Sequence, residues 1–103
     1  MKNLNNMLKQ AQALQQKMME VQREMEDKTL EVASGGGMVT VVVNGKQRVV
    51  EIKIEKEIIN PDDPGMLQDL IIAAVNKGLD EAQNMVAEAV NQVTGNMNLP
   101  KIF

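Results

Sequence analysis

The sequence predicts an α+β fold in which a long N-terminal helix, a three-stranded antiparallel meander and a long second helix follow one another. Residues 2–30 contain no Gly or Pro and many good helix formers. In residues 39–55, apolar side chains alternate with the two-residue period of a strand on both sides of an Asn-Gly pair. Residues 66–93 repeat apolar side chains at every helical turn. The chain has 103 residues and no long linker, so we expect a single domain over residues 1–103, with residues 96–103 as a C-terminal tail.

The first helix is predicted to carry an apolar seam along one side. Its members recur at alternating spacings of three and four: Leu4, Met7, Ala11, Leu14, Met18, Val21 and Met25. A pattern sustained over about three heptads is typical of a helix that packs along another helix. At 1.5 Å per residue this helix is about 40 Å long, too long for so small a domain to cover. Part of it is expected to project or to pair with a second copy of the chain.

Three strands are predicted between the two helices. Residues 30–33 form a short strand before the helix-breaking triplet Gly35–Gly37, and residues 39–43 form a second strand whose apolar side chains alternate. Asn44-Gly45 predicts a tight turn, because both residues tolerate positive φ. Residues 49–55 then form the third strand, with an apolar face and a charged face. The strands should therefore pair as a meander.

The second helix has a predicted beginning and end. Asp63 is expected to cap its free amides, and Pro64 suits the first helical position. A broad apolar face follows, which predicts packing against both the sheet and a neighbouring helix. Thr94-Gly95 is expected to end the helix through a glycine after its last turn.

The composition excludes most kinds of chemical site. The chain has no His, Cys, Trp or Tyr, so a zinc finger, a thiol nucleophile, a Ser-His-Asp triad and an aromatic platform for single-stranded nucleic acid are all excluded. We expect no enzymatic activity, no cofactor, no metal and no small-molecule substrate. No apolar stretch resembles a signal peptide or a membrane span, which favours a cytoplasmic protein with no membrane partner.

Three motifs have a functional and a structural interpretation. Gly35–Gly37 is followed by a strand rather than by a helix, so a turn is favoured over a phosphate-binding loop. The carboxylates of Asp62, Asp63 and Asp69 suit a divalent cation, but helix capping is the favoured interpretation. The methionines of the seam suit an adaptable binding surface, but helix pairing is favoured for them.

The charge distribution is more informative than the net charge of −3. Residues 1–19 hold three lysines and no acid, whereas the rest of the chain is net acidic. A lysine-and-amide stripe recurs every seven residues on the outward face of the predicted helix: Lys2, Lys9, Gln16 and Arg23. Such a stripe suits the phosphate backbone of a nucleic acid, and an ordinary solvated helix face fits the same residues.

The sequence also resembles the YbaB/EbfC family of small bacterial nucleoid-associated proteins, over nearly its whole length. The most specific part of the likeness is the run Leu67–Asn76. The other matching motifs are Lys9–Gln12, Gly35–Val41, Asn44-Gly45, Pro61–Asp63, Thr94-Gly95 and Leu99-Pro100.

The resemblance implies a tweezer-like homodimer that binds DNA in the cytoplasm, at the nucleoid, and that affects chromosome organisation and gene expression without enzymatic activity. In the family, DNA contact is attributed to the projecting helices. Together with the stripe, this gives the candidate DNA-binding residues Lys2, Lys9, Gln10, Gln16, Lys17 and Arg23.

Two functions therefore compete. The first is duplex DNA binding by a homodimer with little sequence specificity, because the chain has only two arginines for reading guanine and no helix-turn-helix pattern. The alternative is a prefoldin-like subunit, in which two long helices joined by hairpins hold protein clients. Added salt separates the two, because DNA binding weakens steeply with salt and apolar capture hardly changes.

Overall fold

The computed structural model describes the backbone of residues 2–96 and the side chains of residues 3–95. The predicted α+β order is confirmed, with two short 3₁₀ turns added. The elements are α1 (Lys2–Asp27), β1 (Thr29–Ser34), η1 (Gly35–Gly37), β2 (Val39–Asn44), β3 (Val49–Ile54), η2 (Lys56–Ile58) and α2 (Pro64–Asn96).

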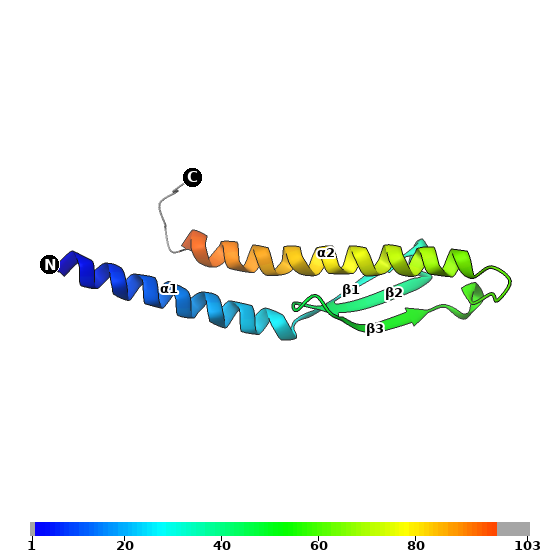
Figure 1. Cartoon of the computed structure of the whole chain (residues 1–103), viewed down its shortest axis with the longest axis horizontal. Coiled ribbons are helices and arrows are strands. Elements are labelled where there is room, and N and C mark those ends of the chain that lie inside the picture. Colours follow the sequence, from blue (N-terminus) through cyan, green and yellow to red (C-terminus); the bar gives the residue numbers. More distant parts are fainter. Residues whose placement is uncertain (1, 97–103) are drawn as a thin grey trace.

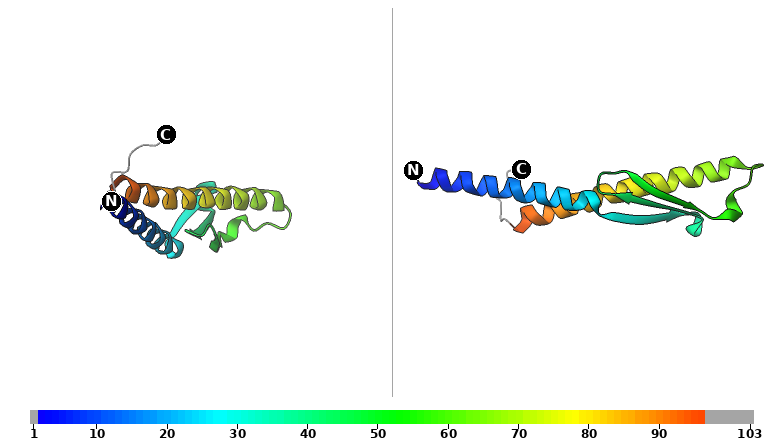
Figure 2. Two further views of the ribbon diagram at one scale, coloured as in Figure 1. Left: turned by 60° about the vertical axis from the view of Figure 1, so that its left-hand side comes forward. Right: turned by 90° about the horizontal axis from the view of Figure 1, so that it is seen from below.

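The molecule is a rod rather than a globule. Its principal extents are 74 × 26 × 16 Å, and its radius of gyration is 20.0 Å, against about 13 Å for a compact domain of this length. The sheet lies under the N-terminal half of α2 (Figure 1). The helix α1 extends away from the sheet, on the side of the C-terminal half of α2. The N-terminal end of α1 extends beyond the end of α2 in both views that show the long axis (Figures 1 and 2).

The core forms between α2 and one face of the antiparallel sheet β1-β2-β3. Val39, Val41 and Val43 of the central strand point toward α2 and are 0% exposed. Gly78 lets α2 approach this closely, because a Cβ there would stand 3.1 Å from both Val32 and Val43. The predicted meander is confirmed, with β1 one residue longer at each end than expected.

The α1 seam is only half covered. Val21 is buried, and Leu14, Met18 and Met25 are half-buried where α1 packs on α2. The remaining seam residues, Leu4, Met7 and Ala11, are exposed. The prediction of helix pairing is thus confirmed for the second half of α1, while its first half projects.

The triple glycine forms a turn between strands, as predicted. All three residues have positive φ, at 60°, 66° and 92°, which only glycine adopts readily. Gly35 also needs its missing side chain, because a Cβ there would lie 2.8 Å from Leu70 Cδ2.

The Asn44-Gly45 turn differs from the prediction. Gly45 does not adopt positive φ; Gln47 does, at 59°. The Asn44 side chain holds the loop instead, since its Oδ1 accepts hydrogen bonds from the amides of Lys46 at 3.0 Å and Arg48 at 3.2 Å. Gly45 is required for another reason, because a Cβ there would overlap the backbone of Met25.

The predicted start of α2 at Pro64 is confirmed, whereas the predicted cap and the predicted end differ from the structure. Pro64 begins the helix, as expected. Asp63 makes no side-chain hydrogen bond with the first turn in the part of the chain that the structure describes. The predicted end at Thr94-Gly95 is wrong: α2 continues through Gly95 to Asn96, and the Thr94 hydroxyl donates to the Asn91 carbonyl at 3.0 Å. The predicted tail beyond Asn96 lies outside the described residues.

None of the described helices is long and apolar enough to cross a membrane.

Candidate nucleic-acid interface

The candidate DNA-binding residues all lie on α1, and five of them are exposed to solvent. Lys9, Gln10, Gln16, Lys17 and Arg23 are exposed. Lys2, the sixth, is the first residue of α1, but its side chain is outside the described residues.

The helical repeat sorts these residues around α1. At about 100° per residue, Lys9, Gln16 and Arg23 fall within about 40° of one another, opposite the seam that packs on α2. Lys17 follows Lys9 by eight residues, so it stands about 80° round the helix and about 12 Å along it. The lysines therefore form a broad outward face on the helix rather than a pocket.

Acidic neighbours weaken the C-terminal part of this face. Lys17 Nζ lies 4.0 Å from Glu20 Oε2, and both side chains are more than half exposed. Exposed pairs of this kind contribute little stability, so a phosphate competes easily for Lys17. Arg23 lies between Glu20 and Asp27, three residues before it and four after it on the same helix face. The positive charge that no neighbouring acid offsets is therefore concentrated at Lys9 and on the side of Lys17 that faces Lys9.

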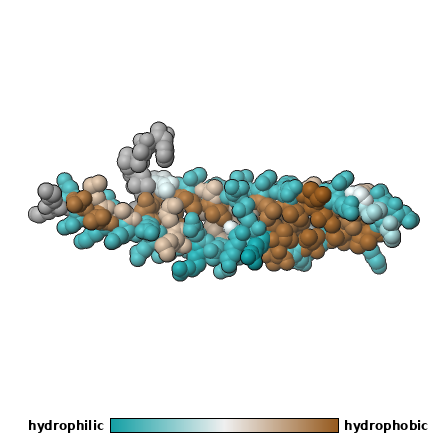
Figure 3. All heavy atoms as spheres, in the orientation of Figure 1, coloured by the Kyte–Doolittle hydropathy of each residue, from teal (hydrophilic) through white to brown (hydrophobic). Residues whose placement is uncertain are grey.

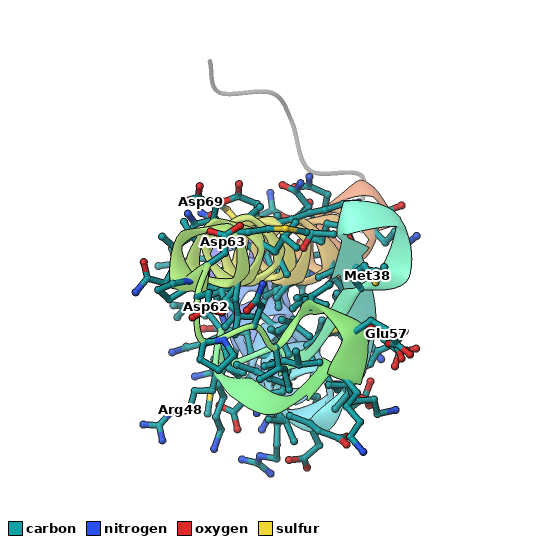
Figure 4. All side chains as sticks on the ribbon, turned by 90° about the vertical axis from the view of Figure 1, so that its right-hand side faces the viewer. Met38, Arg48, Glu57, Asp62, Asp63 and Asp69 are labelled. Carbon is teal, nitrogen blue, oxygen red and sulfur yellow. The ribbon has the colours of Figure 1, made fainter. Side chains whose placement is uncertain are left out.

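A second group of bases gathers where the β2–β3 loop meets the end of α1. The Gly45 amide donates to the Lys28 carbonyl at 3.1 Å. This contact brings Lys28 close to the loop bases Lys46 and Arg48, all three exposed. Arg48 points away from the body of the molecule (Figure 4).

Sequence reasoning missed this group because its members lie on different elements. The Asn44-Gly45 pair predicts only a turn, and the contact of Gly45 with the end of α1 has no local pattern in the sequence. Three acids of the last α1 turns, Glu24, Glu26 and Asp27, lie just before Lys28 in the sequence. The group therefore has less local positive charge than the first half of α1.

The three aspartates near α2 do not form a metal site. Asp62, Asp63 and Asp69 lie at separate positions around the start of the helix (Figure 4). Among residues 2–96, no group of three potential ligands is close enough together to hold a metal ion.

A shallow cleft opens where α1 and α2 diverge. It has a volume of about 190 Å³ and is lined by Met25, Lys28, Met85, Glu88, Ala89 and Gln92. Its floor comes from the methionines of the two helices, and its rim carries one base and one acid. The predicted role in helix packing is thus confirmed for the half-buried Met18 and Met25, whereas Met7 is exposed.

Comparisons with known proteins show the family of the chain. The chain is 46% identical to a nucleoid-associated protein of Alkaliphilus metalliredigens over 98% of this chain and 89% of that protein. It is 47% identical to a nucleoid-associated protein of Syntrophobacter fumaroxidans over 92% of this chain and 86% of that protein. An uncharacterized protein from Helicobacter pylori shares the fold, with a TM-score of 0.61 at 24% identity over 84% of this chain and 96% of that one. Residues 1–97 match the model of the YbaB/EbfC DNA-binding family, to which this chain therefore belongs.

Proposed function

We propose that this protein binds duplex DNA as a homodimer, with little sequence specificity, through the outward face of the projecting half of α1. Membership of a DNA-binding family supports the choice of ligand. The relatives' names, nucleoid-associated proteins, support a place at the nucleoid in the cytoplasm and an effect on nucleoid organisation and gene expression. The observation that carries the proposal is a projecting helix segment with exposed lysines and no acid before Glu20.

The mechanism is neutralisation of phosphates by lysines held on a rigid rod. Lysine ammonium groups on long side chains reach phosphates without reading bases. Two copies of α1 present six lysines from their acid-free segments, three from each chain. Base readout is slight, because both arginines, Arg23 and Arg48, lie outside that segment.

The affinity is expected to depend steeply on salt. With about six phosphate contacts per dimer, the association constant should fall about 10³-fold between 50 and 200 mM monovalent salt. Fluorescence anisotropy on two unrelated duplexes of equal length measures this, and the two curves should agree closely. A salt-independent affinity, or a large preference for one duplex, would contradict the proposed contacts.

A second candidate function rests on the apolar residues of the same segment. Leu4, Met7 and Leu8 are 57%, 64% and 55% exposed, which suits capture of apolar protein clients in the manner of a prefoldin-like subunit. Suppression of client aggregation at both salt concentrations, lost when these residues are changed to Ser, would favour that function over DNA binding.

A further inference from the structure

The Asn44-Gly45 pair is a chemically reactive sequence that the proposed function leaves unused. It is the only Asn-Gly pair in the chain. In such a pair the backbone nitrogen of Gly can attack the side-chain carbonyl carbon of Asn, because Gly has no Cβ to obstruct the approach. Asn is one of the thermally labile residues of proteins. Two contacts of the β2–β3 loop act on this reaction in opposite ways.

The first contact prepares the carbonyl group of the Asn44 side chain. Its Oδ1 accepts hydrogen bonds from the amides of Lys46 at 3.0 Å and Arg48 at 3.2 Å. Attack on the Cγ atom places negative charge on Oδ1, and two amide donors aimed at an oxygen stabilise such a charge. The exposed side chains of Lys46 and Arg48 add positive charge nearby. The folded loop therefore activates the carbon atom that is attacked.

The second contact occupies the attacking nitrogen. The Gly45 amide donates its hydrogen to the Lys28 carbonyl at 3.1 Å, so this bond must break before the nitrogen can turn toward Asn44. The backbone of Met25 also closes the space around Gly45, since a Cβ added there would overlap the Met25 carbonyl. The end of α1 therefore holds Gly45 away from the reaction.

From these contacts we infer that Asn44 is a site of spontaneous deamidation, which the end of α1 keeps closed. When the end of α1 moves off the loop, the Gly45 nitrogen loses its proton to a solvent base and bonds to Asn44 Cγ. The bond between Cγ and Nδ2 breaks, and ammonia leaves with a proton taken from solvent. Water then opens the five-membered imide at either carbonyl, which gives Asp or the β-linked isoaspartate. Water is the sole co-reactant, and the inference does not depend on DNA binding.

Solvent reaches the loop, and its contact with α1 can open locally. Asn44 and Gly45 are half-buried, and residues 46–50 are exposed. Figure 3 shows hydrophilic atoms gathered where the end of α1 meets the sheet. The core side chains of β2 pack with those of α2 and not with the end of α1. The end of α1 can therefore leave the loop while β2 stays folded.

The isoaspartate product changes the main chain as well as the charge. It adds one methylene group to the backbone at the last residue of β2. Asn44 is paired with Thr29 across the β1–β2 ladder, and its amide donates to the Arg48 carbonyl at 3.0 Å. The longer backbone displaces Gly45 from Lys28 and so breaks the contact between the loop and the end of α1. Deamidation here therefore loosens the base of the helix that projects.

Two proline variants of the full chain, incubated at mildly alkaline pH, test the control by α1. Met25→Pro removes a helix hydrogen bond beside the loop, so deamidation of Asn44 should become about tenfold faster than in the parent. Ala11→Pro makes the same change in the projecting half of α1 and is the matched control. Its rate should stay within about twofold of the parent, because distant sites act independently. Cleavage after Lys and Arg releases residues 29–46, in which Asn44 is the only Asn. Mass spectrometry with chromatographic separation of the Asp and isoaspartate forms of this fragment measures the rate.

Two further measurements keep the test decisive if Met25→Pro folds poorly. Amide hydrogen exchange shows whether the amides of Val41 and Val43 stay protected in that variant, which reports an intact β2. The parent itself needs no substitution: in urea, where α1 no longer holds Gly45, Asn44 should deamidate at least about tenfold faster than in the folded protein.

The outcomes separate this inference from DNA binding. Faster deamidation in Met25→Pro with β2 still protected, and a parental rate in Ala11→Pro, support control by the end of α1 even if the protein ignores DNA. Equal acceleration in the two variants overturns it. So does a folded parent that deamidates at Asn44 as fast as the unfolded chain.

Discussion

The triple variant Lys2→Glu, Lys9→Glu, Lys17→Glu is expected to lose all detectable retardation of duplex DNA. It replaces every base of the acid-free segment by an acid, so a surface that attracted phosphates repels them. Lys9 and Lys17 are exposed, and the only ion pair of Lys17 found among the described residues is the exposed one with Glu20. The fold should therefore be preserved. Gel retardation at low salt measures binding, with circular dichroism and solution mass as checks on the protein.

A matched control separates the effect of the position of the bases on DNA binding from the effect of the net charge. Changing Lys28, Lys46 and Arg48 to Glu alters the net charge by the same amount, but at the loop beside the end of α1. This variant should retain most of its DNA affinity at low salt, because those bases lie next to the acids of the last α1 turns. Equal losses in the two variants would mean that binding follows net charge rather than the projecting half of α1.

The fold was predictable from the sequence because the hydrophobic periodicity and the Gly and Pro residues that break helices indicate the same elements. The seam of α1, the alternating valines of β2 and the broad face of α2 each have one hydrophobic period, typical of a helix or of a strand. The glycine triplet and Pro64 mark boundaries that the structure keeps. Local patterns thus carry the order and type of every long element.

The site was less predictable, because it depends on how far the helices overlap. The spacing of Lys9, Gln16 and Arg23 places them opposite the seam, as predicted. Which part of α1 projects follows from where α2 lies, and no local pattern encodes that. The bases Lys28 and Arg48 were missed for the same kind of reason, since only tertiary contact brings them together.

The Asn44-Gly45 motif predicts a positive φ that Gly45 does not have. Asn44-Gly45 resembles a turn that needs positive φ, yet the chain uses Gln47 for that conformation. Gly45 is instead the point where the β2–β3 loop touches the end of α1, through its own amide and the Lys28 carbonyl. The residue therefore allows the close contact between the β2–β3 loop and the end of α1.

The Gly45→Ala variant is expected to lose about 3 kcal/mol of unfolding free energy. The added methyl overlaps the Met25 carbonyl and comes within 3.2 Å of the Glu26 amide nitrogen. These are backbone atoms, so they cannot rotate aside as the end of a side chain could. Relief requires the end of α1 to move off the loop, which also breaks the hydrogen bond between Gly45 and Lys28. Urea unfolding at one fixed protein concentration measures the loss, since the stability of the proposed dimer would vary with concentration.

The matched control is Gly65→Ala, in the first turn of α2. A Cβ there meets only Asp63 Oδ1, at 3.9 Å, which is an ordinary contact. Its stability should stay within about 0.5 kcal/mol of the parent or rise, because Ala is the better helix former. Amide hydrogen exchange then locates the damage: in Gly45→Ala, protection should fall first in α1, with the β2 amides retained longer. If Gly45→Ala were as stable as Gly65→Ala, the contact between the loop and α1 would not set the direction in which α1 projects.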